Sequence, residues 1–355
     1  MTWLAWRQLR TQAVIAVALL LVIAVALALT GPNLAHLYDT VVRHCHTHRD
    51  CGPVTRNFAR QDLILRRLSI VAILAPGILG VFWGAPLVAR ELESGTYRLV
   101  WTQSVTRTRW ILVKLGLVGL ASVLVTGALT LMVTWWSSPL DRLHDAPFGT
   151  FDHRDVVPLG YAAFAFALGV TLGVLIRRTV PAMAATLAVF AGVRFLFTGW
   201  VRARLLAPLH RSVPLQVGIS SGPNPLGAVV KRADWVISDS TINARGQVIG
   251  QFGGVGPSGR IGFNPIGHSG LVDFVGVGRC PNTFPVGSAP STGKANVTLQ
   301  EAAQRCAAHF HLRESLTYLP VGRFWALQWY ECASFFAMAL LLAAAAVWRV
   351  RRRPG

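Results

Sequence analysis

Acidic residues are scarce in this chain, which has 15 Asp and Glu residues against 34 Lys and Arg residues and a formal net charge of +19. Charged residues of both signs make up only 14% of its 355 residues, and hydrophobic residues make up 53%. That mixture is too apolar for a soluble protein of this length. The basic residues sit mainly at the edges of apolar runs. They form no single charged face, which favours anionic lipid headgroups over nucleic acid as their partner.

Motifs for enzymatic chemistry are also lacking. No G-x-x-x-x-G-K-[ST] motif occurs, and the glycine-rich run 250–262 has no Lys, so the chain has no phosphate-binding loop with which to hydrolyse a nucleotide. Its apolar runs contain no paired Asp, Glu or His residues of the kind that a membrane-embedded enzyme needs. No repeat of 20 to 50 residues is found, which argues against a solenoid. We therefore expect neither catalysis nor a bound cofactor.

Long apolar runs dominate what is present. A helix needs roughly 20 apolar residues to cross a hydrocarbon core of about 30 Å. Six runs approach or reach that length: Ala13–Leu29, Leu68–Val88, Leu115–Trp136, Val157–Ile176, Val180–Trp200 and Trp329–Trp348. The sequence thus predicts an all-α polytopic membrane protein with six transmembrane helices.

The first run follows Arg7 and Arg10, as the core of a secretory signal would, but it is long and ends without a small-residue cleavage site. We interpret it as a retained helix. Lys and Arg residues are more numerous in the connections that share a side with the N-terminus than in the shorter connections opposite. Both termini are therefore expected in the cytoplasm, and the chain in the cell membrane.

The stretch 201–328 is too long for a simple connection and is rich in glycine. We expect it to form a large extracytoplasmic domain of mixed or irregular structure between helices five and six. Short strands are predicted around 235–237 and 247–249, and a helix over 299–310. The organisation is then helices one to five in 1–200, this domain in 201–328, and helix six with a basic tail in 329–355.

Four of the five cysteines fall outside the membrane in this topology. Cys45 with Cys51 and Cys280 with Cys306 are the simplest disulfide pairs, and free thiols are the alternative. His44, His46 and His48 offer imidazoles beside Cys45, but we interpret this polar stretch as a solvated loop and predict no metal site.

The segment 90–114, between helices two and three, leaves the membrane in charged residues, breaks at Gly95 and re-enters as an amphipathic stretch. Such a segment is suited to docking a soluble partner and passing its movement to the membrane helices. An ordinary basic cytoplasmic loop is the simpler alternative. The predicted coupling residues are Glu91, Glu93, Gly95, Thr96, Ser104, Thr106, Arg107, Arg109 and Lys114.

At this segment the chain resembles the permeases of type-2 ATP-binding-cassette (ABC) exporters in bacteria. The shared pattern is an acidic turn, Gly-Thr, a Ser-Val-Thr element, an Arg and a Lys that enters the third helix. The resemblance extends to 6–10 and to 318–331. It implies a six-helix subunit that pairs with a second permease subunit, identical or not, and couples to a cytosolic ABC ATPase, which binds ATP and Mg. The domain at 201–328 is larger than the short loop of the simplest members.

Two further features concern the helices. Arg194 and Glu331 are the ionisable residues nearest the membrane interior, and either contact substrate, form a gate ion pair, or extend to the interface. Gly169 and Gly173 form a G-x-x-x-G motif that, with Ala182, Ala184 and Ala185, predicts tight packing between helices four and five within one subunit.

The predicted function is export of an unidentified hydrophobic or amphipathic substrate, since no ring of like charges points to ions. The alternative is a membrane-anchored sensor or binding protein that works through 201–328.

Overall fold

The structure is a computed structural model that describes residues 2–47, 70–95, 106–144, 147–215, 234–252, 271–274, 278–281 and 304–352. Within these residues, six helical segments are long and apolar enough to cross a membrane: Arg10–Pro32, Ile70–Glu93, Arg107–Ser138, Val157–Ile176, Thr179–Leu205 and Val321–Arg352. Each contains or overlaps one of the predicted runs. The prediction is thus confirmed as six helices that are long and apolar enough to cross a membrane.

The chain forms two compact units. The helical unit comprises Met1–His144, Thr150–Leu205 and Trp325–Gly355, and the sheet unit comprises Asp145–Gly149 and Leu206–Phe324. Most of the sheet unit therefore falls within the predicted domain 201–328. The last helix begins at Phe324, five residues before the predicted run.

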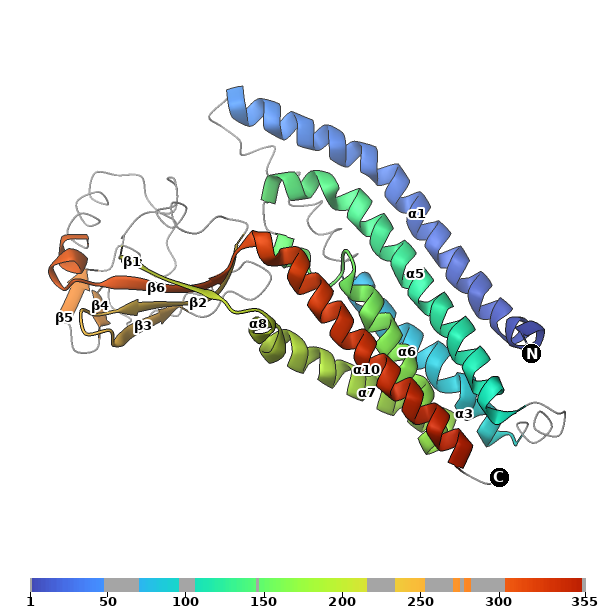
Figure 1. Cartoon of the computed structure of the whole chain (residues 1–355). Helices are drawn as coiled ribbons and strands as arrows, with labels where there is room; N and C mark the ends of the chain where they lie inside the picture. Colours follow the sequence, from blue (N-terminus) through green and yellow to red (C-terminus); the bar gives the residue numbers. More distant parts are fainter. Residues whose placement is uncertain are drawn as a thin grey trace. The chain divides into compact units, whose positions relative to one another are not determined.

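Helix α1 (Thr2–Thr47) has 46 residues, which at 1.5 Å per residue is about 69 Å and exceeds the membrane thickness. Its apolar part is therefore the span, and the helix continues beyond it. Helix α5 (Arg107–His144) packs along α1 (Figure 1). The indole Nε1 of Trp136 donates a hydrogen bond to Thr30 Oγ1 at 2.9 Å, which ties the two helices together.

The second span is helical over 70–79, continues as a π-helical turn η1 (Gly80–Gly84) and ends as α3 (Ala85–Glu93). Helix α6 (Val157–Ile176) packs directly on its backbone. A Cβ atom added at Gly169 would lie 2.8 Å from the Ala85 nitrogen, and one at Gly173 would lie 2.7 Å from the Ala85 oxygen. The absence of side chains at these positions allows the two backbones to touch.

This packing corrects the predicted partner of the G-x-x-x-G motif. The motif packs against the second span, although α6 also contacts α7 (Thr179–Leu196). Helix α7 places the buried Ala182 in a small cluster with Ala85 and Ala89. Small residues from three helices thus meet at α3, and the contact lies within one subunit, as predicted.

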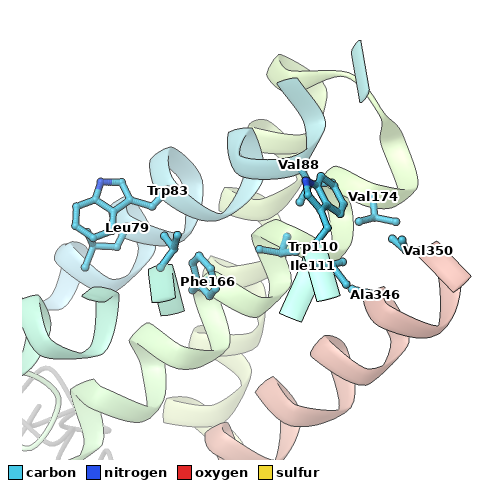
Figure 2. Packing of buried hydrophobic residues seen from close by; sticks show 11 residues of the cluster. Leu79, Trp83, Val88, Trp110, Ile111, Phe166, Val174, Ala346 and Val350 are labelled. Atoms are coloured by element: carbon cyan, nitrogen blue, oxygen red, sulfur yellow. The ribbon is translucent and has the colours of Figure 1, made fainter. Parts of the chain in front are cut away.

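One end of the helical unit is closed by an apolar cluster. Buried residues of α3, α5, α6 and α10 (Phe324–Arg352) pack together there. Figure 2 shows Trp110 and Ile111 of α5 lying among Val88, Val174 and Ala346, which come from the other three helices. Because α5 begins and α10 ends at this cluster, the two helices run antiparallel on α6.

Short segments complete the helical unit and lead out of it. A π-helical turn η3 (Phe197–Val201) and the short helix α8 (Arg202–Leu205) continue α7. A 3-10 turn η2 (Pro147–Thr150) precedes α6.

The sheet unit contains a four-stranded antiparallel sheet in the order β1-β6-β2-β3 (Figure 1). Its strands are β1 (Leu209–Pro214), β2 (Trp235–Ile242), β3 (Val248–Phe252) and β6 (Arg313–Leu319). Strands β4 (Leu271–Phe274) and β5 (Gly278–Pro281) form a separate pair, residues 304–309 are helical, and η5 (Val321–Arg323) leads to α10. The predicted strands near 235 and 247 are confirmed.

A pair of carboxyl groups lies within the sheet. Asp239 on β2 and Glu314 on β6 are each only 8% exposed. Burial, together with the neighbouring Asp239, raises the pKa of Glu314 to about 8, and burial also raises the pKa of Asp239. Glu314 therefore keeps its proton at neutral pH and donates it in a hydrogen bond to Asp239.

The close packing at Gly169 predicts that even a methyl group is not tolerated there. We expect Gly169→Ala to lower the free energy of unfolding by about 1–3 kcal/mol, because the added Cβ meets backbone atoms that cannot move aside. Gly192→Ala is the matched control, since a Cβ at Gly192 has no atom within 4 Å. Thermal unfolding of the purified chain in detergent measures both. Equal midpoints for the two variants would contradict this packing.

The carboxyl pair predicts that stability falls as the pH rises. Between its ordinary value of 4.5 and about 8, Glu314 is protonated in the folded sheet but ionised in the unfolded chain. The folded state then binds more protons, so its stability is greatest below this window and declines through it. We expect Glu314→Gln to melt at a higher temperature than the wild type above pH 8, with a smaller difference below pH 4.5. A difference that is independent of pH would contradict the assignment.

Candidate functional site

The structure describes the two ends of the predicted coupling segment, residues 90–95 and 106–114. Helix α3 ends at Glu93, Ser94 caps it by donating its backbone N–H to the Arg90 carbonyl at 3.0 Å, and Gly95 follows with a φ of +73°. Gly95 thus provides the left-handed conformation that stops the helix. Thr96 and Ser104 lie outside the described residues.

Glu91 and Lys114 form an ion pair inside the chain. The ammonium Nζ of Lys114 lies 2.5 Å from Glu91 Oε1, also donates to the Leu87 carbonyl at 3.4 Å, and lies 4.7 Å from the centre of the Trp110 ring. Lys114 is only 4% exposed. An ammonium buried among apolar residues needs an anion, and Glu91 provides it. These two charges therefore join α3 to α5 and are not both presented to a partner.

Glu93 joins α3 to α7. Its Oε2 accepts the backbone N–H of Thr179 at 2.9 Å and the Thr179 hydroxyl at 2.6 Å. Thr179 is the first residue of α7, where backbone N–H groups have no partner within the helix and a negative charge is stabilised by the helix dipole. A carboxylate 86 residues earlier in the chain thus caps this helix.

The other predicted coupling residues surround the start of α5. The hydroxyl of Thr106 accepts the backbone N–H of Arg109 at 3.4 Å, which makes Thr106 the N-cap of α5. Arg107 is half-buried and Arg109 is exposed. Arg90, near the end of α3, is also exposed. Arg90 and Arg109 are therefore accessible cations at the two described borders of the segment.

A second site lies at the other end of α7, where five polar side chains meet inside the helical unit. We call them the charge cluster: Asp152, Tyr161, Arg194, Arg202 and Glu331. They come from the turn before α6, from α6, from α7, from α8 and from α10. Arg202, Tyr161 and Glu331 are at most 2% exposed.

Arg202 is the centre of the cluster. Its Nε and Nη2 donate to the two carboxylate oxygens of Glu331 at 2.8 and 2.9 Å. Its Nη1 donates to Asp152 Oδ2 at 3.2 Å, and its Nη2 also bonds Asp152 Oδ1. One guanidinium thus holds two carboxylates, each through two of its nitrogens, which is the geometry that the planar fork of arginine favours.

Arg194 completes the charge balance. It donates from Nη2 to Asp152 Oδ1 at 3.1 Å, its Nη1 lies 3.8 Å from Glu331 Oε1, and its guanidinium carbon lies 3.6 Å from the centre of the Tyr161 ring. The Tyr161 hydroxyl donates to Glu331 Oε1. Two guanidiniums therefore face two carboxylates, and the cluster carries no net formal charge.

Burial alone would raise the pKa of Asp152, but Arg202 and Arg194 outweigh this effect and lower that pKa well below its usual range. Asp152 is therefore ionised at neutral pH. It stays available as the anionic partner of both arginines.

The π-helical turn η3 helps to bring the two arginines together. Arg194 and Arg202 are eight residues apart, a spacing that rotates side chains about 80° from one another in a regular α-helix. A π-turn accommodates one additional residue, which reduces the offset to about 20°. Both guanidiniums can then reach the same two carboxylates.

Gln328 holds the turn that carries Asp152. Its Oε1 accepts the backbone N–H of Val157 at 3.0 Å, and its Nε2 donates to the Phe151 carbonyl at 3.3 Å. Gln328 is fully buried on α10, one turn before Glu331. Helix α10 therefore holds the backbone of this turn through Gln328 and is joined to its carboxylate, Asp152, through Glu331 and Arg202.

The sequence pointed to two of these five residues, and the structure brings both into the cluster. Glu331 does not extend to an interface, because it is fully buried against Arg202. Asp152, Tyr161 and Arg202 were missed. Sequence reasoning could have found Asp152, which precedes the fourth apolar run, and Arg202, which follows the fifth. A carboxylate and an arginine so close to the membrane need partners of opposite charge.

Neither predicted disulfide can be traced to both partners. Cys306 is disulfide-bonded, but the side chains of Cys45, Cys51 and Cys280 lie outside the described part of the chain, as do those of His44, His46 and His48. Cys332 is a buried free thiol. Among the described residues, no three His, Cys, Asp or Glu side chains are grouped so as to hold a metal ion.

Comparison with known proteins gives a family match. The model of a family described as ABC-2 membrane transporter related matches residues 17–202. The match begins within the first span and ends at Arg202, within the fifth, so Glu331 lies outside it. No curated protein and no solved structure matches the chain.

The charge cluster predicts a large cost for removing one charge and a smaller further cost for removing its partner. We expect Glu331→Gln to lower the free energy of unfolding by about 3 kcal/mol, because Arg202 loses a buried anion. Adding Arg202→Gln leaves Asp152 and Arg194 as a balanced pair, so the double variant should lose less than the sum of the two single losses. Unfolding in mixed micelles, followed by circular dichroism, measures this. Additive losses would contradict the pairing.

Proposed function

Since the chain belongs to the ABC-2 membrane transporter related family, we propose that it is the membrane-spanning permease subunit of a bacterial ABC exporter. A separate cytosolic ATPase subunit binds ATP and Mg and hydrolyses the nucleotide. The permease couples that hydrolysis to export of a hydrophobic or amphipathic substrate. A second permease subunit completes the path across the membrane.

The observation that carries this proposal is the attachment of the segment 90–114 to three membrane helices. Glu91 joins α3 to α5 through Lys114, and Glu93 joins α3 to the start of α7. A displacement of this segment by a docked subunit is therefore passed to all three helices together. Arg90 and Arg109 supply exposed cations for an acidic patch on that subunit.

Helix α7 connects the coupling segment to the charge cluster. Its first residue is bound to Glu93, and Arg194 lies in its last turn. Rotation or displacement of α7 would change the distance of Arg194 from Asp152 and Glu331. We assign the cluster the role of a gate ion pair that holds one arrangement of α6, α7 and α10 and is rearranged in the transport cycle.

The proposed topology has both termini in the cytoplasm and the sheet unit outside the cell. The last turn of α10 contains Arg349, Arg351 and Arg352, and the start of α5 contains Arg107 and Arg109. Both lie at the cluster of Figure 2, hence on one side of the membrane. The positive-inside rule places that side in the cytoplasm.

The test is co-purification with the ATPase. The chain is purified in mild detergent from its host with a C-terminal tag, and the proteins that accompany it are identified. We expect an ATPase with a phosphate-binding loop to accompany the wild type and to be lost with Arg109→Glu. Arg10→Glu is the control, since it reverses an exposed charge on α1, outside the segment 90–114. Glu91 and Glu93 are poor choices because their loss would disturb the helices themselves.

Two outcomes would contradict the proposal. Equal recovery of the ATPase with Arg109→Glu and Arg10→Glu would show that the segment 90–114 is not part of the docking surface. If no ATPase accompanies the wild type even after cross-linking, the permease assignment fails. A membrane-anchored sensor or binding protein acting through 201–328 would then be the better hypothesis.

A further inference from the structure

An open groove runs along the helical unit between α5 and α10. Its volume is about 780 Å³. Its walls include Leu120 on α5 and Leu340 on α10, which are 61% and 70% exposed, and its floor is formed by α6, where Phe166 is buried. The groove arises because α5 and α10 both pack on α6 but leave a gap between themselves.

The lining of the groove is apolar except at one end, where Arg351 lies. Arg351 belongs to the last turn of α10 together with Arg349 and Arg352. Trp348 also lines this end, and the guanidinium carbon of Arg352 lies 4.5 Å from the centre of its ring. A tryptophan and several arginines at the end of a span mark the level of the lipid headgroups.

The dimensions of the groove suit an acyl chain. From Phe336 to Arg351 it extends along α10 for about 22 Å at 1.5 Å per residue. One leaflet of a hydrocarbon core of about 30 Å is roughly 15 Å deep. A chain that starts at the level of Arg351 can therefore lie in the groove down to the middle of the bilayer.

From these observations we propose that the groove is a binding site for an anionic glycerophospholipid of the surrounding bilayer. One acyl chain lies between α5 and α10 on the floor of α6. The headgroup phosphate pairs with Arg351 in a charge-assisted hydrogen bond. A fixed lipid would fill the gap between the two helices and hold them at a constant separation on α6.

A helix of a second copy fits this groove less well. A membrane helix with its side chains is about 10 Å in diameter, and such a helix would enter this open groove by one face only. The single charge at the headgroup level also matches a phosphate better than the apolar face of a membrane helix.

Gly116 gives a way to fill the groove without disturbing the fold. It lines the groove on α5, and a Cβ added there has no atom within 4 Å. Gly116→Phe should therefore occupy the space of the acyl chain. Gly192→Phe is the matched control, because Gly192 is an exposed helical glycine with open space on α7, away from the groove.

The experiment is native mass spectrometry of the delipidated full chain titrated with phosphatidylglycerol or phosphatidylcholine. The wild type should bind the first phosphatidylglycerol at least fivefold more tightly than phosphatidylcholine, the fold-change that corresponds to roughly 1 kcal/mol for one arginine at an anionic surface. Gly116→Phe should lose this first bound lipid, and Gly192→Phe should keep it. Arg351→Gln should abolish the preference for phosphatidylglycerol, and Arg352→Gln, which alters an arginine outside the lining, should retain it.

Three results would overturn the proposal. Equal lipid binding by Gly116→Phe and Gly192→Phe would show that the groove is not the site. An equal affinity of the wild type for the two lipids would remove the role of Arg351. If Gly116→Phe converts a dimer to a monomer in the same spectra and leaves lipid binding unchanged, the groove is an interface between copies of the chain.

Discussion

The helical unit depends on one constraint, that a charge held among apolar helices must have a partner of opposite charge. The buried Lys114 meets it through Glu91, and the charge cluster meets it near the end of α7. At the start of α7, the exposed Glu93 instead caps the helix by accepting the backbone N–H of Thr179. Near its end, Arg194 joins Arg202, Asp152 and Glu331 in a neutral cluster. Because an unpaired buried charge is costly, each site strongly favours one arrangement of its helices. A movement of α7 has to exchange these partners, which is the behaviour expected of a two-state element.

Close backbone contact provides the rigid part of the same unit. Gly169 and Gly173 allow α6 to touch the second span at distances that leave no room for a side chain. In lipid, such contact replaces hydrophobic burial as the source of packing energy. Helix α6 is consequently the most enclosed of the spans and contacts the second span, α5 and α7. The proposed coupling segment, which continues from α3, is therefore attached to the least adjustable pair of helices.

The groove between α5 and α10 follows from the way both helices pack on α6. Helices α5 and α10 both contribute to the apolar cluster where one begins and the other ends, and a gap remains between them along α6. A gap lined by leucine and alanine cannot be left empty in a membrane without losing van der Waals contact. In our proposal, a lipid of the surrounding membrane fills this gap, and Arg351 gives the lipid headgroup a charged partner. In the sheet unit, by contrast, two acidic groups are buried side by side without a cation, and they remain buried because Glu314 retains its proton.

The sequence by itself determined the number and approximate positions of the membrane helices, the strands near 235 and 247, and the charged segment after the second span. These features depend on composition and periodicity within about 20 neighbouring residues, which any such stretch displays on its own. The pairing of side chains was decided only by the tertiary structure. Glu91 with Lys114, Glu93 with Thr179, and Arg202 with Asp152 and Glu331 are far apart in the chain, and whether they meet depends on the rotation of each helix about its axis. The partner of the G-x-x-x-G motif was predicted wrongly for the same reason. A stripe of small residues shows which face of a helix is open to close contact, but only packing among all the helices decides which neighbour occupies that face.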